Sequence, residues 1–198
     1  MKKLLLSFLI IVYACMFYNR DQEGLEALAN TAVQINETIT LDSTYADMEQ
    51  YEVENSSHFY SISLKESLRI FSEKSSAILF YAKPTSKECK IAVKVLDEVA
   101  KELNVKVYIV DTSDSVSEED ITTLSEYISS TFHVDDAGNT SFVVPDLIAV
   151  NAGEITGFHT STVKGISVSS DSIELTENQT KELKTEYLKV VHSISKSA

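Results

Sequence analysis

The chain is poor in cysteine and in basic residues, and each shortage excludes a class of protein. Its 198 residues include two cysteines, Cys15 and Cys89, which are too few for a framework of disulfides. The four histidines are scattered and lack the spacing of a metal site. Lys and Arg number 17 against 30 Asp and Glu, so the net charge is −13. Nucleic acids and anionic lipids attract basic patches, so neither is expected as a partner.

Glycine and proline are also scarce, with five and two residues. Gly138, Gly153, Gly157 and Gly165 are isolated turn residues, so the chain has no glycine-rich phosphate loop. Paired carboxylates of the glycosidase kind are not evident either. We therefore expect no metal and no cofactor. The remaining composition, 43% hydrophobic and 24% charged, is that of a globular protein, and the length allows one domain plus an appendage.

The N-terminus has the pattern of an export signal. A basic start, Met1–Lys3, precedes the apolar run Leu4–Tyr13, which is shorter than the roughly 20 residues that span a bilayer. The ending Val12–Cys15 resembles the lipobox of bacterial lipoproteins, in which the cysteine is acylated. This resemblance implies lipid attachment at Cys15 and a location on the outer face of the bacterial cytoplasmic membrane. Cleavage before Cys15 without acylation, or an uncleaved anchor reaching Tyr18, are the alternatives.

The sequence predicts three parts: a signal peptide with lipobox at residues 1–15, an acidic spacer at residues 16–57 and a globular domain at residues 58–198. The spacer is polar and has little apolar content, which is typical of a solvated, partly disordered stalk. Its stretch from Tyr45 to Val53 is expected to pack on the domain as an extra strand or turn.

Hydrophobic periodicity predicts an alternation of strands and helices in the domain. The expected strands are residues 58–62, 77–81, 105–110, 146–150 and 154–159, and the expected helices are residues 63–73, 87–103, 121–131 and a last one capped at Thr176. The strand Ala77–Tyr81 is continuously apolar, as in a central strand covered on both faces. The order predicts an α/β fold with a mixed central sheet, helices on both faces, and a C-terminal β-hairpin plus helix.

The stretch from Phe80 to Lys90 carries a family resemblance. It follows the central strand, leads into a helix and reads FYAKPTSKECK. It resembles the active-site segment of thioredoxin-like proteins, and most closely the branch of bacteriocin transport accessory proteins, whose loop reads like R-P-T-C-P-x-C-R. Pro84 and Thr85 then lie in register, while Ser86 stands at the first cysteine and Cys89 at the second.

A second match lies further along the chain. Val143–Pro145 resembles the cis-proline segment that faces the redox site in this family, and the resemblance extends from about Phe59 to His192. It implies a thioredoxin-like fold and an exposed backbone at Val144 that pairs with an extended peptide. A trans proline at the start of an edge strand is the alternative for Pro145.

The loss of the first cysteine removes dithiol chemistry. In a C-x-x-C site the first sulfur attacks as a thiolate, stabilised by the helix N-terminus. Ser86 cannot form a disulfide, and its hydroxyl is instead a good helix cap. Many thioredoxins also carry a buried acid just before this stretch, and the matching residue here is Leu79. Lys87 and Glu88 lie in the degenerate loop without a catalytic role, so Cys89 is the single candidate for catalysis.

Three hypotheses about function remain. The first is an extracytoplasmic, membrane-anchored and non-catalytic lipoprotein that binds an extended peptide or partner protein between Pro84–Ser86 and Val144–Pro145. The resemblance implies for it an accessory role in export, maturation or immunity. The second is a monothiol redox protein that uses Cys89 in disulfide exchange. The third is a scaffold domain whose groove binds nothing.

Overall fold

The computed structural model describes residues 27–113, 117–135, 137–163 and 174–195. The predicted signal peptide, the lipid-attachment residue Cys15 and the first part of the predicted spacer lie outside these ranges. Within them, the helices are all too short or too polar to cross a bilayer.

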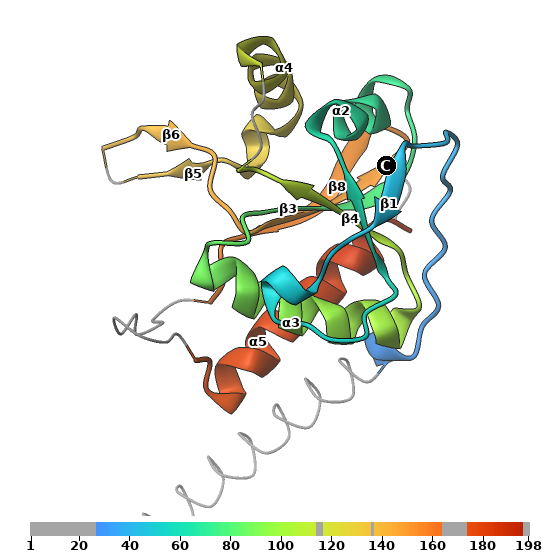
Figure 1. Cartoon of the computed structure of the whole chain (residues 1–198), viewed down its shortest axis with the longest axis vertical. Coiled ribbons are helices and arrows are strands. Elements are labelled where there is room, and N and C mark those ends of the chain that lie inside the picture. Colours follow the sequence, from blue (N-terminus) through green and yellow to red (C-terminus); the bar gives the residue numbers. More distant parts are fainter. Residues whose placement is uncertain (1–26, 114–116, 136, 164–173, 196–198) are drawn as a thin grey trace, which may run out of the picture.

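A six-stranded sheet forms the centre of the molecule (Figure 1). In spatial order its strands are β1 (Ser43–Tyr45), β2 (Phe59–Ile62), β4 (Val107–Asp111), β3 (Ala77–Ala82), β7 (Asp146–Asn151) and β8 (Glu154–Thr160). Strands β2 and β3 run parallel to β4, whereas β7 is antiparallel to β3 and β8 is antiparallel to β7. From β2 onward this is the order of the thioredoxin fold, with β1 added antiparallel at the edge.

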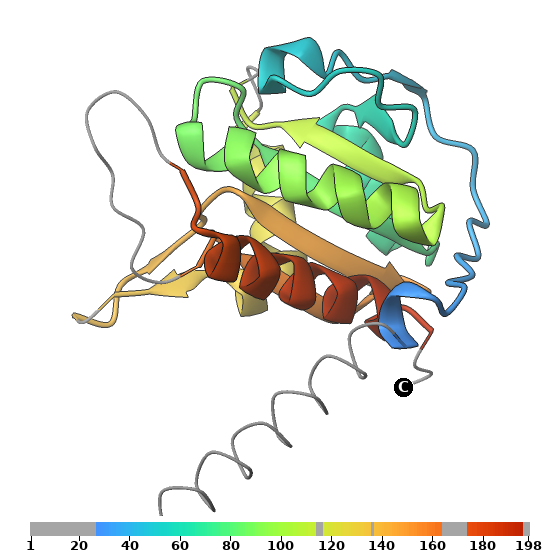
Figure 2. The ribbon, with the colours of Figure 1, turned by 90° about the horizontal axis from the view of Figure 1, so that it is seen from below.

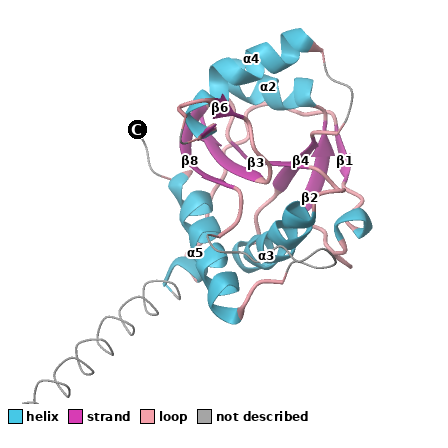
Figure 3. Ribbon diagram, turned by 90° about the vertical axis from the view of Figure 1, so that its left-hand side faces the viewer, coloured by secondary structure: helices cyan, strands magenta, loops and turns pink. Residues whose placement is uncertain are grey.

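Helices cover both faces of the sheet. They are α2 (Leu64–Ser72), α3 (Lys87–Leu103), α4 (Glu118–Ile128) and α5 (Glu177–Ser193), with short 3-10 turns η1 (Glu49–Tyr51) and η2 (Ser129–Thr131). Helices α3 and α5 lie side by side on one face, while α2 and α4 lie on the other (Figures 2 and 3). The predicted α/β thioredoxin-like fold, with its C-terminal hairpin and helix, is therefore confirmed.

Local signals set where the helices begin. The Ser63 hydroxyl accepts the N–H of Glu66, and Thr176 and Gln179 cap each other reciprocally. The Ser117 hydroxyl likewise accepts the N–H of Asp120, so α4 begins three residues before the predicted Ile121. The sequence also indicates this cap at Ser117, so the predicted range left out only the first helical turn.

The residues before position 58 take part in the fold. Strand β1 pairs with β2, and Met48, Tyr51 and Val53 are buried in the layer that contains α3. Glu52 then binds both Lys90 and Lys94 of α3, and these hydrogen bonds lower the pKa of Glu52 to about 2. The core therefore begins earlier in the chain than residue 58.

A small hairpin stands beside the main sheet. Its strands, β5 (His133–Val134) and β6 (Thr140–Ser141), have two residues each, and the sequence suggested only a turn there. The carboxylate of Asp135 closes the loop by accepting the backbone N–H groups of Ala137 and Asn139. Hydrogen bonds from Asn139 lower the pKa of Asp135. Strands this short leave no periodic pattern in a sequence.

Candidate functional site

The side chain of Ser86 shapes the start of α3. The Ser86 hydroxyl accepts the backbone N–H of Cys89 at 3.3 Å, so Ser86 is the helix cap that its sequence position indicated. The N–H of Ser86 donates to the carbonyl of Lys83 at 2.9 Å and closes the loop into a turn. In this loop Thr85 and Lys87 are exposed. Pro84, Ser86 and Glu88 are half-buried.

Cys89 is a free thiol with an exposed fraction of 0%. Burial raises the pKa of the Cys89 thiol, whereas hydrogen bonds from the Lys83 backbone and the Ser86 hydroxyl lower that pKa by less. The Lys83 N–H lies 3.4 Å from the sulfur. A covered thiol that resists ionisation is a poor nucleophile, because the thiolate is the reactive form.

The predicted counterpart of the family's buried acid was misplaced by one residue. Side chains on β3 alternate between two layers, so Phe80 lies in the layer of Cys89 and Leu79 lies in the opposite one. The matching position on the thiol's side is therefore Phe80 and not Leu79. Both residues are apolar, so β3 still supplies no proton acceptor to Cys89.

The Val144–Pro145 peptide bond is cis. Pro145 is buried, and its carbonyl accepts the N–H of Ser161 at 2.7 Å. Val144 is half-buried and contacts both core layers, including the one that contains Cys89. Among the described residues we find no hydrogen bond to the backbone of Val144.

A hollow of about 580 Å³ lies next to this region. We call it the groove, and its walls include Glu88, Phe132, Val134, Val143, Phe158 and Thr160. Val134 and Phe158 are 59% and 43% exposed, which is high for large apolar side chains in this protein. The groove thus adjoins the degenerate loop through Glu88 and the proline segment through Val143. The predicted residues Pro84, Thr85, Ser86, Val144 and Pro145 do not line it.

The hairpin and the end of β8 were missed as parts of the site. Phe158 stood in the predicted last strand, but its exposure depends on the helices that cover that strand. Val134 stood in a segment with no clear pattern. The sequence singled out the loop and the proline segment that adjoin the groove, but not the walls that β5 and β8 provide.

Asp146 is a second residue that the sequence did not single out. It follows Pro145, is fully buried and accepts hydrogen bonds from the hydroxyls of Thr131 and Thr160. Burial raises the pKa of the Asp146 carboxyl to about 7, although both hydroxyls act to lower it. The sequence did contain one signal for Asp146, which is an acidic residue at the first position of a predicted apolar strand.

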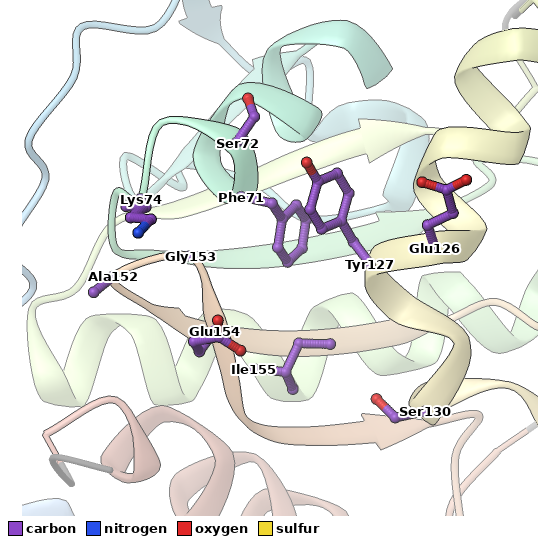
Figure 4. Close-up of a pocket in the computed structure, with 10 residues that line it drawn as sticks. All are labelled: Phe71, Ser72, Lys74, Glu126, Tyr127, Ser130, Ala152, Gly153, Glu154 and Ile155. Carbon is purple, nitrogen blue, oxygen red and sulfur yellow. The ribbon is translucent and has the colours of Figure 1, made fainter.

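A second hollow, of about 520 Å³, lies at the other end of the sheet (Figure 4). Phe71 and Tyr127 stack there with ring centroids 5.0 Å apart, next to the turn of Ala152 and Gly153. This turn lies at the end of β7 opposite Asp146, so the second hollow is separate from the groove. Across the described parts of the chain, His, Cys, Asp and Glu side chains nowhere gather in the groups of three that hold a metal ion.

Two thioredoxins are among the solved structures to which the chain is similar. No family model matches the chain, and no curated protein sequence matches it. Among solved structures, it is similar to oxidised thioredoxin O2 from Arabidopsis thaliana, with 14% identity and a TM-score of 0.36 over 52% of this chain and 83% of that one. It is also similar to thioredoxin from Aeropyrum pernix, with 19% identity and a TM-score of 0.35 over 50% of this chain and 73% of that one.

Proposed function

We propose that this protein is a non-catalytic, thioredoxin-fold binding protein that holds an extended peptide or a segment of a partner protein in the groove. The observation that supports it most is the state of Cys89, which is covered and has a raised pKa, next to a hydroxyl in the place of the attacking sulfur. Such a centre cannot perform dithiol exchange. The adjoining groove is open, and its lining combines the apolar side chains of Phe132, Val134, Val143 and Phe158 with polar ones.

The groove suits a chain segment more than a small rigid molecule. Its apolar side chains come from three separate elements, and the unpaired backbone of Val144 offers a hydrogen-bonding edge beside it. Glu88 at one side and the net charge of −13 favour a segment that combines apolar residues with lysine or arginine. Binding of this kind uses neither a thiol nor a cofactor.

The proposal places the domain outside the cytoplasm. The lipobox-like ending at Cys15 supports a lipid anchor on the outer face of the bacterial cytoplasmic membrane. The loop resemblance supports a place near the bacteriocin transport accessory proteins, with a role in export, maturation or immunity. Mass spectrometry of the mature N-terminus tests the anchor, since an unmodified Cys15 contradicts it.

The binding role is tested with a pool of fluorescent decapeptides built from Val, Phe, Thr and Lys. We expect Phe158→Ser to weaken binding by about fivefold or more, because removing a partly buried aromatic ring costs about 1 kcal/mol or more and 1.4 kcal/mol is tenfold. Ile121→Ser is the matched control, because Ile121 is 44% exposed on α4 and Phe158 is 43% exposed. Cys89→Ser should bind as the wild type does.

Three results would contradict the proposal. Loss of binding in Cys89→Ser points to the monothiol redox protein instead, because a binding groove does not depend on that sulfur. Equal weakening by Ile121→Ser and Phe158→Ser, or no binding by the wild type, removes the groove as a specific site and favours the scaffold domain.

A further inference from the structure

Asp146 lies beneath the groove, in a small network of four contacts. The Thr131 hydroxyl is 2.7 Å from Asp146 Oδ2 and 3.0 Å from the carbonyl of Ile128. The Thr160 hydroxyl is 3.0 Å from Asp146 Oδ1 and 3.0 Å from the carbonyl of Thr131. The two hydroxyls therefore face four oxygen acceptors.

Counting protons shows which form of Asp146 fits this network. Each threonine has one hydroxyl proton, so two protons serve four contacts when Asp146 is ionised. Both hydroxyl protons then point to the carboxylate, so the carbonyls of Ile128 and Thr131 receive no hydrogen bond from the two threonines. A protonated Asp146 donates a third proton to the Thr131 hydroxyl, which frees that hydroxyl to donate to Ile128. The neutral acid thus satisfies one more contact than the carboxylate does.

The surroundings offer the carboxylate no compensating cation. The titratable groups that interact electrostatically with Asp146 are Tyr81 from β3, on the same side of the sheet, and Tyr187 from α5, and burial raises the pKa of both phenols. From η2 and β8 the facing groups are the neutral Thr131 and Thr160. Within the described residues, no charged side chain contributes to the shift of the Asp146 pKa.

The network joins two walls of the groove. Thr131 ends η2 and leads directly into Phe132 and β5, whereas Thr160 ends β8 two residues after Phe158. Both threonines also line the groove themselves. One wall of the groove follows η2 and the other is the end of β8. Asp146 and the hydrogen bond from Thr160 to the Thr131 carbonyl hold these two walls together, and we call this arrangement the clamp.

We propose that protonated Asp146 closes this clamp and that loss of its proton loosens it, so that pH regulates binding in the groove. This inference rests on the proposed binding function. It assigns Asp146 as a positioning residue, because it acts through Thr131 and Thr160 and does not itself line the groove. Binding is strongest on the acidic side of neutrality and weakens as the pH rises.

Asp146→Asn tests the proposal, because an amide donates to Thr131 at every pH and carries no charge. If the protonated form alone binds, the affinity of the wild type for the decapeptide pool falls about tenfold from pH 6 to pH 8. Asp146→Asn should bind as the wild type does at pH 6 and keep that affinity at pH 8. Glu126→Gln, which removes an exposed carboxyl on α4, should retain the wild-type pH dependence.

A ligand-free measurement separates this proposal from the proposed function. The amide resonances of Phe132 and Ser161 should titrate near pH 7 in the wild type and not in Asp146→Asn. His133 and His159 also line the groove and are present in both proteins, so only the pH dependence that differs between the wild type and Asp146→Asn is assigned to Asp146. A pH dependence of these resonances that is the same in the wild type and in Asp146→Asn overturns the clamp. A titration that the variant removes, with no peptide binding at any pH, supports the clamp and overturns the binding function instead.

Discussion

At the scale of single residues, the candidate site includes two buried groups that lie on opposite faces of the sheet. Cys89 lies in the layer of α3 and α5, whereas Asp146 shares the opposite layer with Tyr81. Burial raises the pKa of both groups, because removal from water disfavours the charged form. One group is thereby made unreactive, and the other is brought into the physiological range.

We predict that Cys89 reacts slowly with a disulfide reagent in the folded protein. At pH 7 its labelling rate should be at least about 100-fold lower than in 6 M guanidinium chloride, because both burial and the raised pKa limit the thiolate. The rate is measured on the full chain by mass spectrometry of the peptide that contains Cys89. Cys15 gives a separate peptide and does not interfere. Fast labelling in the native state contradicts this prediction and supports the monothiol hypothesis.

The sequence predicted some residue roles better than others. The cap at Ser86 depends on a residue three positions away, so local pattern was sufficient. The partners of Asp146 lie 15 and 14 residues away on separate elements, and no local pattern connects them. The predicted position, Leu79, was wrong by one residue. A shift of one residue along a strand moves the side chain to the other face of the sheet.

At the scale of elements, the turn between β7 and β8 is restricted by its close approach to α2. Gly153 has φ of +83°, and a Cβ there would lie 2.6 Å from the carbonyl oxygen of Phe71. The chain passes so near because the Gly153 N–H donates to the Ser75 carbonyl at 2.9 Å. Backbone strain and a steric clash therefore act together at this position.

We predict that Gly153→Ala lowers the free energy of unfolding by about 2–4 kcal/mol, since the clash adds to the conformational cost. Gly138→Ala is the matched control. Gly138 has nearly the same φ, +84°, but a Cβ added there would meet no atom within 4 Å, so only about 1 kcal/mol is expected. Urea unfolding of both variants gives the comparison. Equal destabilisation contradicts the role of the Phe71 contact.

Element prediction from the sequence succeeded where segments were long. Helix α3 and strand β3 were found nearly to the residue, because their apolar patterns extend over several turns or a whole strand. Strands β5 and β6 were not found, since two residues give no periodicity. Strand β5 lines one wall of the groove, so this wall comes from the part of the fold with the weakest sequence signal.

At the scale of the whole molecule, the raised pKa of Asp146 links stability to pH. The folded state holds this proton up to about pH 7, whereas an unfolded aspartate releases it near its ordinary pKa of 3.8. The folded protein therefore binds more protons between these values, and this contribution to stability is lost as the pH rises. Each pKa unit corresponds to about 1.4 kcal/mol.

We predict that Asp146→Asn becomes more stable relative to the wild type as the pH increases. The difference in unfolding free energy between the two proteins should grow by roughly 2–3 kcal/mol from pH 5 to pH 7 and change little above pH 8. Denaturant unfolding at three or four pH values measures it, with Glu126→Gln as the control. A difference that is constant with pH means that Asp146 is ionised throughout.

The cap at Ser86 has one more consequence for the cell. The described part of the chain holds a single thiol, and an oxygen keeps the start of α3 in shape. Proteins with two active-site thiols alternate between two covalent forms as their compartment becomes more oxidising or more reducing. The described part of this domain has no such pair to close, so we expect the proposed binding to stay the same when aeration or the supply of reductant changes.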